Sequence, residues 1–513
     1  MPLLLGADNW VVIAGRGLKF LTIKVANFKT GTRYSKTDNL RYEICNGGLR
    51  MGVTQKLAEF VLETRLKNIS EKAVRIAQEH CLDCLGVTLA GSMHEAGKIV
   101  AKQAKEDRCV PEAGVIGSGF RTSATNAALA NGIMAHVLDY DDHAWLNPFN
   151  PSHPSVAVVP VVLALGEKLN SSGQEILVAY ILGTEVWAKV ALNCSPPGHL
   201  IGWHPTSLFG TIGAAAAAAK LLKLNIEQTS MAFGIACSMT GGLRRNFGTM
   251  TKSLHAGMAA SNGVRAALLA KEGFTANTDI FGDPDAFSGT FFREGKCDVA
   301  KMTQNLGTPF SIEARRPSIK RYPCPGCNAN GLDATFQLIE EKRISYDEIE
   351  LVEAHVNPFV PKIMIYPEPK TSLEGKFSAE YNLAAAILDR TVNIASYAEE
   401  KVNNPKMREA LRKIKMIVHP DWPPRVGGTI VVIKLKNGTT YKNQVEVWKG
   451  SPDMPLSLEE LTEKYRDCAR FVLTQEEIEQ SIQLVMNLSE LHSVKELMDI
   501  LIQTSRTKQA LAG

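Results

Sequence analysis

The stretch Leu208–Ala219, which reads LFGTIGAAAAAA, decides the fold class of this 513-residue chain. Its run of alanines indicates a helix that packs so closely against its neighbours that larger side chains would not fit. The apolar run stops at Lys220 after about 12 residues, well short of the roughly 20 that a membrane-spanning helix needs. The stretch therefore predicts a buried helix in a mainly helical core and no transmembrane segment.

Helical patterns continue on both sides of this run. From Thr54 onward, apolar residues recur at helical spacing. The sequence Ser172–Glu175 (SGQE) is a capping box that opens an apolar helix. Helices return from Leu456, where Thr474–Glu477 (TQEE) forms another capping box. We therefore expect a helical domain that the C-terminal part of the chain completes.

The pattern changes after about residue 315, where several prolines interrupt helical spacing. β-type segments follow around residues 348–356 and 414–418. The clearest element is a hairpin at Asn437-Gly438, because Asn-Gly between two β-rich runs supplies the two positive-φ residues of a type I′ turn. These segments predict a second, α+β region.

The predicted fold class is mainly α: an all-helical domain with an inserted, smaller α+β lid domain. Residues 1–50 show no clear periodicity, and Met51 precedes the first strong helix, so we interpret this segment as an extension or the result of a mis-set start codon. The expected boundaries are 1–50 for the N-terminal extension, 51–315 and 449–508 for the discontinuous helical domain, and 316–448 for the lid domain.

Composition restricts the function. The net charge of +4 is spread over 57 basic and 53 acidic residues, which gives no electrostatic footprint for nucleic acid or an anionic membrane. Ten cysteines are too few for a disulfide scaffold, so we expect a cytoplasmic protein. No glycine-rich phosphate loop follows a predicted strand, and no Gly-x-Ser-x-Gly nucleophile elbow occurs in a strand-turn-helix context. Nucleotide cofactors and serine-hydrolase chemistry are not indicated.

The first chemically interesting segment runs from His136 to Asp142 and His143, and continues across a Pro- and Asn-rich loop to His153. Its acids and histidines could bind a metal or act as general acid and base. The carboxylates could also merely cap helices or orient a histidine. Basic residues elsewhere would compete with a cation for these carboxylates, so we expect no metal.

Two further segments place basic groups at helix starts. His204, before Pro205 at the entry to the alanine-rich helix, marks a helix N-terminus, which attracts anions. Taken alone, such a histidine is more often packed and hydrogen-bonded than catalytic. The segment Gly241–Gly257 could form a solvated loop with one interior histidine, or its lysine could meet a carboxylate or act as a desolvated acid or base. Its potential cations are Arg244, Arg245, Lys252 and His255.

The fourth segment, Lys320–Asn328 (KRYPCPGCN), lies at the predicted domain junction. Its Cys-x-x-Cys has no second pair at zinc-like spacing, and no βαβ pattern surrounds it. Neither structural zinc nor redox chemistry is therefore indicated.

The set of segments is more distinctive than any single one. In chain order they are Asp83–Gly91, His136–Asp142, His153–Ser155, His204–Thr206, Gly248–Gly257, Lys320–Cys324 and Gly375–Ser378. Together, over roughly residues 51–505, they resemble the MmgE/PrpD family, which contains 2-methylcitrate dehydratase, cis-aconitate decarboxylase and an iminodisuccinate epimerase.

This resemblance implies a helical domain with an α+β lid, a homodimer, and a pocket between the domains that needs no metal or organic cofactor. It implies a small di- or tricarboxylate substrate and no nucleic-acid or membrane partner. The catalytic residues expected from it are Asp139, His153, His204 and Lys252. The expected substrate-binding residues are His143, Arg244, His255, Lys320, Arg321 and Tyr322.

The sequence departs from the family pattern at two places. Family members usually carry a histidine shortly after the Tyr-Pro-x-Cys turn, and the decarboxylase also has one at the position of Pro325, whereas residues 325–330 read PGCNAN. The position of His143 is a threonine in the decarboxylase. These departures leave open that the substrate differs from those of the known members.

The resemblance leads us to expect a metal-independent lyase of the 2-methylcitrate dehydratase type, which eliminates water from a small 2-hydroxy polycarboxylate by His/Lys acid-base catalysis. One imidazole, that of His153 or His204, would remove the α-proton, and the other, or Lys252, would protonate the departing hydroxyl. Asp139 would orient a histidine and fix its tautomer. The alternatives are a cis-aconitate-type decarboxylase, an iminodisuccinate-type epimerase, and a non-catalytic paralogue.

Overall fold

The computed structural model describes residues 10–13, 21–24, 43–44, 49–145, 151–194, 202–283, 285–292, 297–423 and 428–504. Residues 1–50 and 51–513 form two separate compact units. In the first unit, two antiparallel strand pairs are described, and the interpretation of this segment as an extension stays a prediction. The strands are β1 (Trp10–Ile13), β2 (Leu21–Lys24), β3 (Glu43–Ile44) and β4 (Leu49–Arg50).

The second unit is mainly helical, as predicted, with small sheets. Its N-terminal helices are α1 (Val53–Glu63), α2 (Glu71–Ser92), α3 (Glu95–Glu106), α4 (Ala124–Val137), α5 (Ser155–Leu169), α6 (Gly173–Leu192), α7 (Pro205–Leu221), α8 (Ile226–Ser238), α9 (Thr251–Lys271), α10 (Phe287–Phe292) and α11 (Ser311–Ala314). Two short antiparallel strand pairs connect some of them: β5 (Ala113–Val115) with β6 (Phe120–Thr122), and β7 (Ala144–Trp145) with β8 (Pro151–Ser152).

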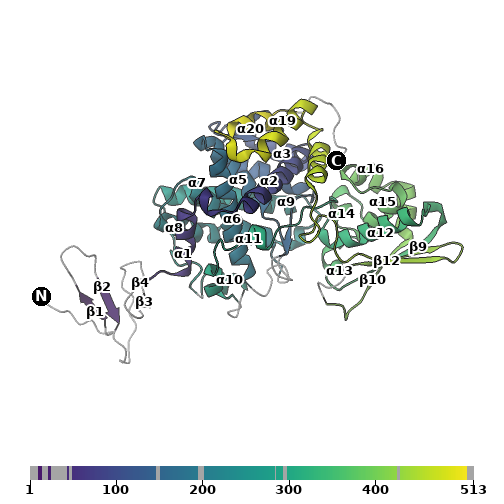
Figure 1. The fold of residues 1–513 in the computed structure, drawn as a ribbon, viewed down its shortest axis with the longest axis horizontal. Helices are drawn as coiled ribbons and strands as arrows, with labels where there is room; N and C mark the ends of the chain where they lie inside the picture. Colours follow the sequence, from purple (N-terminus) through teal and green to yellow (C-terminus); the bar gives the residue numbers. More distant parts are fainter. Residues whose placement is uncertain are drawn as a thin grey trace. The chain divides into compact units, whose positions relative to one another are not determined.

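The C-terminal helices complete this helical part. They are α18 (Leu458–Ala469), α19 (Gln475–Met486) and α20 (Lys495–Leu501). Helices α18 and α19 pack against α2, and α20 packs against α5, so the ends of this unit meet in space (Figure 1). Both predicted capping boxes are present, at the starts of α6 and α19. The alanine-rich run lies in α7 and is almost completely buried, as predicted.

A four-stranded sheet forms the rest of the unit. Its strand order is β10-β9-β11-β12, with β9 and β10 parallel and the other pairs antiparallel. Alternate residues of β9 and β11 are buried, and α12 and α15 pack on the sheet. The strands are β9 (Ile349–Val356), β10 (Ile414–Val418), β11 (Ile430–Leu435) and β12 (Thr440–Gln444). The helices are α12 (Ala329–Glu341), α13 (Val360–Ile363), α14 (Ser372–Lys376), α15 (Ala379–Asp389), α16 (Glu399–Val402) and α17 (Pro405–Arg412).

The predicted hairpin is β11–β12, but the predicted type I′ turn is wrong. Gly438 has a φ of +85°, whereas Asn437 is not among the residues with positive φ. The N–H of Gly438 donates to the carbonyl of Leu435 over 2.9 Å, which closes a turn through Lys436 and Asn437. A three-residue loop with glycine in the last, left-handed position satisfies the strand twist equally well.

Two large hydrophobic cores lie within the second unit. One is built from residues between 57 and 319 and between 461 and 501, and the other from residues between 322 and 445. The chain crosses between them next to Ile319 and returns next to Gly450, and the N–H of Ile319 donates to the carbonyl of Gly450 over 3.0 Å. Because residues 51–513 form one compact unit, the domain boundaries and the lid arrangement stay predictions.

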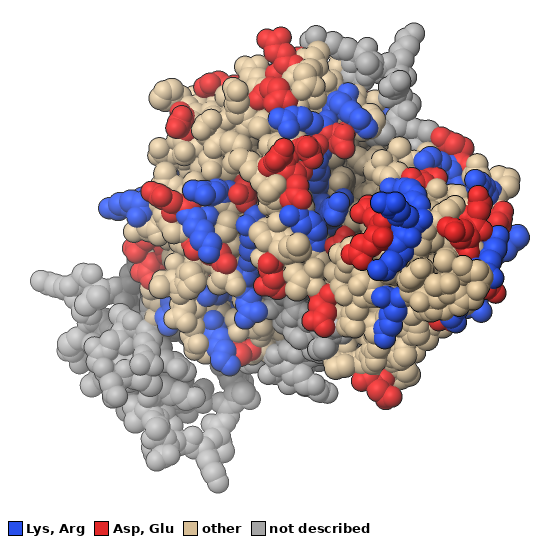
Figure 2. Space-filling view, turned by 45° about the vertical axis from the view of Figure 1, so that its right-hand side comes forward, with Lys and Arg blue, Asp and Glu red and all other residues tan. Residues whose placement is uncertain are grey.

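The surface shows no single-sign patch on the face drawn in Figure 2, where basic and acidic side chains are interspersed. Among the described residues, no helix is long and apolar enough to cross a membrane.

Candidate active site

Five separate chain segments bring together the four predicted catalytic residues and Lys320, which was predicted to bind substrate. Asp139 follows the last turn of α4, and its φ of +51° turns the chain sharply out of the helix. His153 lies just before α5. His204 is the N-cap residue of α7, and Lys252 is in the first turn of α9. Lys320 comes from the crossing between the two cores, so both parts of the unit contribute.

These side chains surround one cavity. The space free of protein atoms there is about 530 Å³, and part of it is open solvent. Its lining residues are Asp139, His143, His153, His204, Pro205, Phe247, Lys252, Lys320, Pro325, Gly326, Cys327, Phe359, Ile363 and Phe377. Six of these residues were predicted as site residues from the sequence: Asp139, His143, His153, His204, Lys252 and Lys320.

A carboxylate shared by two ammonium groups forms one wall. The Oδ1 of Asp139 lies 2.5 Å from the Nζ of Lys252 and 3.1 Å from the Nζ of Lys320. Burial alone would raise the pKa of Asp139, but the two ammonium groups lower it below its ordinary value. Burial lowers the pKa of Lys252, and Asp139 opposes that shift. Since one carboxylate faces two cations, the group retains a positive charge that can meet an anionic substrate.

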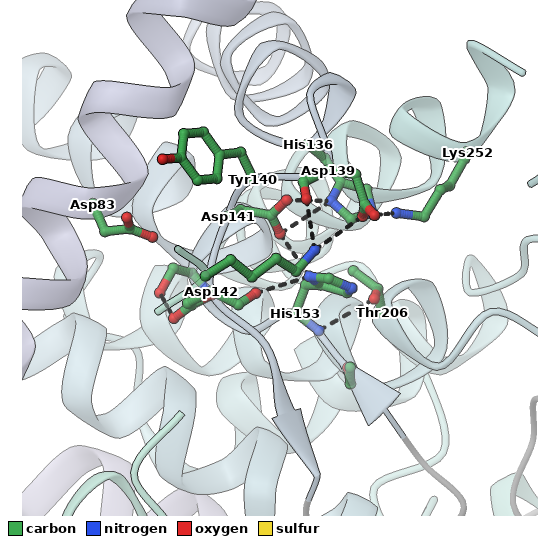
Figure 3. A network of polar contacts seen from close by, with 12 residues as sticks. Asp83, His136, Asp139, Tyr140, Asp141, Asp142, His153, Thr206 and Lys252 are labelled. Atoms are coloured by element: carbon green, nitrogen blue, oxygen red, sulfur yellow. Dashed lines mark hydrogen bonds and ion pairs between the residues drawn. The ribbon is translucent and has the colours of Figure 1, made fainter. Parts of the chain in front are cut away.

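The prediction that Asp139 orients a histidine is wrong, because Asp141 does so. The Nδ1 of His136 lies 3.0 Å from Oδ1 of Asp141, and the Nδ1 of His153 lies 2.6 Å from its Oδ2. Figure 3 shows Asp141 among these imidazoles, while Asp139 points toward Lys252. Burial would raise the pKa of Asp141, but the adjacent imidazoles lower it. One ionised carboxylate therefore orients two rings.

Backbone contacts fix the ring of His153 further. Its Nδ1 lies 2.8 Å from the carbonyl oxygen of Asp142. A carbonyl oxygen can only accept a hydrogen bond, so Nδ1 carries a hydrogen, and in the neutral form of such a ring Nε2 holds the lone pair. The backbone N–H of His153 donates to Oγ1 of Thr206 over 3.2 Å. This geometry presents His153 as a general base.

Asp142 supports the same loop from behind. Its Oδ2 accepts from Oγ of Ser155 and lies 2.7 Å from Nδ1 of His80 on α2. Lys464 of α18 is the second support: its Nζ lies 2.6 Å from Oδ1 of Asp83, a neighbour of His80 on α2. All of these side chains are buried, and the loop that carries Asp139 and Asp141 is thus held by polar contacts to distant elements.

Among the residues that the structure describes, His136, Asp141 and His153 form a group whose possible ligand atoms lie within 4.8 Å of one another, close enough for a metal ion. The Nδ1 atoms of both histidines face Asp141, so the two ring N–H groups already donate to its carboxylate. The group therefore fits a hydrogen-bonded support better than a cation site, and it is not needed as a ligand set for the chemistry considered below.

A second pair of histidines joins a residue of the cavity wall to one behind it. His204 lines the cavity, and its Nδ1 lies 3.0 Å from the Nδ1 of His255 on α9. Burial lowers the pKa of His204 well below its ordinary value, and the nearby His136 and Lys252 lower it further. Burial also lowers the pKa of His255 to about 4. Both rings are therefore neutral near pH 7. His255, predicted to bind substrate, lies behind His204 rather than in the cavity lining.

The segment in which the family histidines are missing forms another wall. Pro325, Gly326 and Cys327 all line the cavity. A Cβ on Gly326 would lie 2.4 Å from the ring of His143, so glycine at this position lets that imidazole approach the backbone. The ring of His143 also stacks on that of Trp448, with ring centroids 5.6 Å apart. His143 therefore occupies space beside the residues that replace the family histidines.

The remaining predicted substrate-binding residues lie elsewhere. Arg244 is in the short helix η3 (Arg244–Asn246) and is not among the cavity-lining residues described. The hydroxyl of Tyr322 donates to Asp333 over 2.7 Å, and the guanidinium of Arg321 lies 3.9 Å from the same carboxylate. Arg321 and Tyr322 therefore contact the second core, and their roles in binding are not supported by their positions.

Sequence reasoning missed the supporting residues. Asp141 and Asp142 stood in the predicted cluster without a distinct role, and His80 and Lys464 were not singled out. Lys376 stood in the Gly375–Ser378 segment; it is buried, its Nζ lies 3.2 Å from the carbonyl oxygen of Pro323, and burial lowers its pKa to about 7. The available signal was a polar residue inside an otherwise apolar helical pattern, at Asp83 and Lys464.

Comparison with known proteins identifies the family. Residues 55–300 match the MmgE/PrpD N-terminal domain, and residues 322–489 match the MmgE/PrpD C-terminal domain. The chain belongs to the MmgE/PrpD family, which confirms the resemblance inferred from its motifs.

Individual relatives are similar over most of their length. The chain is 30% identical over 464 residues to the cis-aconitate decarboxylase of Mus musculus, covering 88% of this chain and 93% of that protein. It is 29% identical over 462 residues to the cis-aconitate decarboxylase of Homo sapiens, covering 88% and 94%. It is 26% identical over 482 residues to the cis-aconitate decarboxylase-like protein oryM of Aspergillus oryzae, covering 88% and 97%.

Proposed function

We propose that this chain is a cofactor-independent lyase that decarboxylates a small unsaturated polycarboxylate of the cis-aconitate type. The observation that carries the proposal is the cavity wall in which Lys252 and Lys320 share Asp139, within one cavity with His153 and His204. Cations next to imidazoles suit a reaction in which a carboxylate is held while a proton moves. Similarity to relatives named cis-aconitate decarboxylase favours this reaction over the dehydration expected from sequence.

The lysines would bind the carboxylates that stay on the substrate. Asp139 offsets only one of the two ammonium charges, so one positive charge remains. A substrate carboxylate would offset that charge. Because Lys252 is almost completely buried, an incoming anion would favour its charged form. Substrate binding and the charge of Lys252 are therefore coupled.

The histidines would handle the proton. When the bond to the departing carboxylate breaks, carbon dioxide leaves and the electron pair shifts into the adjacent unsaturated system. A proton from an imidazole N–H then ends on the carbon at the other end of that system. His204 is the better donor, because its Nδ1 is engaged with His255 and its Nε2 is the nitrogen left for the cavity. His153, with a lone pair on Nε2, would orient a protonated substrate group or act as the base.

A hydro-lyase acting on a 2-hydroxy polycarboxylate is the second candidate. The observation that favours it is His143, a third imidazole in the cavity lining beside Gly326. Dehydration needs a base for the α-proton and a separate acid for the hydroxyl. His153 and His143 would supply both groups.

Proton NMR in deuterated buffer separates these reactions. EDTA-treated protein would be incubated with cis-aconitate, citrate, 2-methylcitrate and iminodisuccinate. Loss of carbon dioxide from cis-aconitate with one deuteron in the product would support the decarboxylase. A new olefinic product from a hydroxy acid would instead support the dehydratase. Deuterium exchange without elimination would instead support an epimerase. No turnover of any compound would refute both candidates.

A further inference from the structure

The contact between His204 and His255 places a constraint on protons. Two Nδ1 atoms 3.0 Å apart cannot both carry a hydrogen in a hydrogen bond, so one ring donates and the other accepts. A neutral imidazole that donates at Nδ1 has a lone pair at Nε2, and one that accepts at Nδ1 carries its hydrogen at Nε2. The pair thus has two neutral arrangements, which differ in the position of the shared proton.

The two rings lie at different depths. His204 lines the cavity and is 2% exposed, whereas His255 does not line it and is 7% exposed. The loop before η3 covers His255: a Cβ on Gly242 would lie 3.0 Å from its Cγ, and the neighbouring Leu243 is 55% exposed. His255 therefore lies between a cavity imidazole and a solvent-facing loop.

His255 is also adjacent to the cation wall along its own helix. It lies three residues after Lys252 on α9, which places both side chains on one side of the helix. Lys252 lowers the pKa of His255, after burial as the larger cause. The ammonium group thus disfavours a second positive charge on this ring, and a proton that arrives there is readily passed on.

We propose that His255 is a relay residue that supplies solvent protons to His204 while substrate fills the cavity. This role rests on the proposed lyase function and extends it. His204 begins with a hydrogen on Nε2 and a lone pair on Nδ1, and His255 begins with a hydrogen on Nδ1 and a lone pair on Nε2.

The transfer balances as follows at each atom. The Nε2 proton of His204 passes to the substrate carbon as carbon dioxide leaves, and the Nδ1 proton of His255 passes to Nδ1 of His204. A buffer acid or hydronium ion gives a proton to Nε2 of His255. Both rings end neutral, and after product release water in the open cavity returns them to the starting arrangement by the reverse transfers.

The test compares substitutions that keep or remove proton transfer. His255→Gln retains a group that can hydrogen-bond to His204 but cannot relay a proton, and His255→Ala leaves space for a small base. We expect each to lower kcat about 10- to 100-fold with little change in KM, in line with the effect of a lost acid-base group. Added imidazole should restore a part of the kcat of His255→Ala in proportion to its concentration, and not that of His204→Ala.

The control is a histidine pair of similar geometry outside the site. The Nδ1 of His355 lies 2.9 Å from Nε2 of His419, so His419→Gln makes the same change in a pair outside the site, and kcat should not change. Full activity of His255→Gln would show that His255 only orients His204 and would overturn the relay. Loss without any imidazole rescue in folded His255→Ala would also overturn it.

A readout that does not depend on turnover separates this proposal from the function. In ¹⁵N-labelled protein, a shared proton gives the Nδ1 signals of His204 and His255 shifts between those of protonated and unprotonated nitrogen, and His255→Gln should move the His204 signals to one tautomer. Independent shifts for the two rings would overturn the relay even if wild-type decarboxylation is found. If the wild type turns over no substrate but the shifts are shared, the proposed function fails and the proton-sharing pair remains.

Discussion

Lys464 of α18 donates a hydrogen bond from Nζ to the carbonyl oxygen of Tyr140, 2.7 Å away. The same ammonium group lies 2.9 Å from the carbonyl of Lys320 and forms an ion pair with Asp83. Tyr140 stands between Asp139 and Asp141, so one side chain from the C-terminal helices holds the backbone next to both. The charge distribution of the cavity therefore depends on a residue that does not line it.

Replacing Lys464 should affect both stability and activity. Lys464→Met leaves the buried carboxylate of Asp83 without its cation, which costs about 3–5 kcal/mol of unfolding free energy. It should lower kcat in the remaining folded protein, because Asp139 and Lys320 lose a backbone anchor. Urea unfolding and steady-state kinetics measure the two effects. The double variant Lys464→Met with Asp83→Asn should regain stability but not kcat, and recovery of both would show that Lys464 acts only through stability.

Asp141→Asn should lower kcat about 10²- to 10⁴-fold, because the amide puts an N–H donor in place of one of the two carboxylate oxygens that accept from the imidazole N–H groups. KM should change little, since the lysines that meet the substrate stay in place. Steady-state kinetics on protein with a wild-type circular dichroism spectrum checks this. Asp142→Asn is the matched comparison, because Asp142 contacts His153 through its backbone carbonyl, which the substitution keeps. An equal loss in both would contradict a specific role for Asp141.

Lys252→Gln should raise KM for a polycarboxylate by at least 10-fold, because it removes one of two cations from the wall. Lys252→Arg should bind the substrate more tightly than Lys252→Gln, since it restores charge with a different shape. Isothermal titration with a non-reacting tricarboxylate would measure affinity without turnover. Unchanged affinity in Lys252→Gln would place the substrate away from this wall.

The lowered pKa of Asp139 predicts that the protein loses stability at acid pH. Its folded-state pKa is lowered below the unfolded value near 3.9. Its stabilising contribution is therefore fully present above about pH 4 to 5, and it is lost as pH falls through the folded-state pKa. The stability difference between wild type and Asp139→Asn should be constant from about pH 5 to 8 and shrink below pH 4. Urea unfolding at each pH checks this, and a difference that grows on acidification would be the wrong sign.

Gly326→Ala should impair the site through His143. The added Cβ would lie 2.4 Å from its ring, and the stack on Trp448 limits the room for the ring to move. We expect a loss of about 1–3 kcal/mol in stability and a change in KM. Gly241→Ala is the control, because no atom lies within 4 Å of its added Cβ. A fully stable, fully active Gly326→Ala variant would show that His143 moves freely.

The sequence allowed local features to be predicted better than long-range partners. The capping boxes at Ser172 and Thr474 were correct, because a box is settled within four residues. The turn at Asn437-Gly438 was predicted as a hairpin but with the wrong turn type. Asn-Gly fits more than one hairpin loop, and the pairing of β11 with β12 selects among them.

The site shows the same limit. Resemblance placed Asp139, His153, His204, Lys252 and Lys320 at one pocket, and all five line the cavity. It did not separate the roles of neighbouring carboxylates. Asp139 and Asp141 point to different partners because the chain leaves α4 with Asp139 in a left-handed conformation, which a pattern of residue types does not specify. Contacts such as that of Lys464 with Tyr140 join residues 324 positions apart and emerge only from tertiary packing.

The hydrogen bond from Ile319 to Gly450 brings together the two points where the chain passes between its cores. A segment whose ends lie side by side can be exchanged for another of different length without moving the helices that remain. Here the exchanged segment would include Lys320 and the wall at Pro325–Cys327, while Asp139, the histidines and Lys252 would stay. Substrate preference could then diverge among relatives by replacement of this one segment, while the histidines of the cavity stay unchanged.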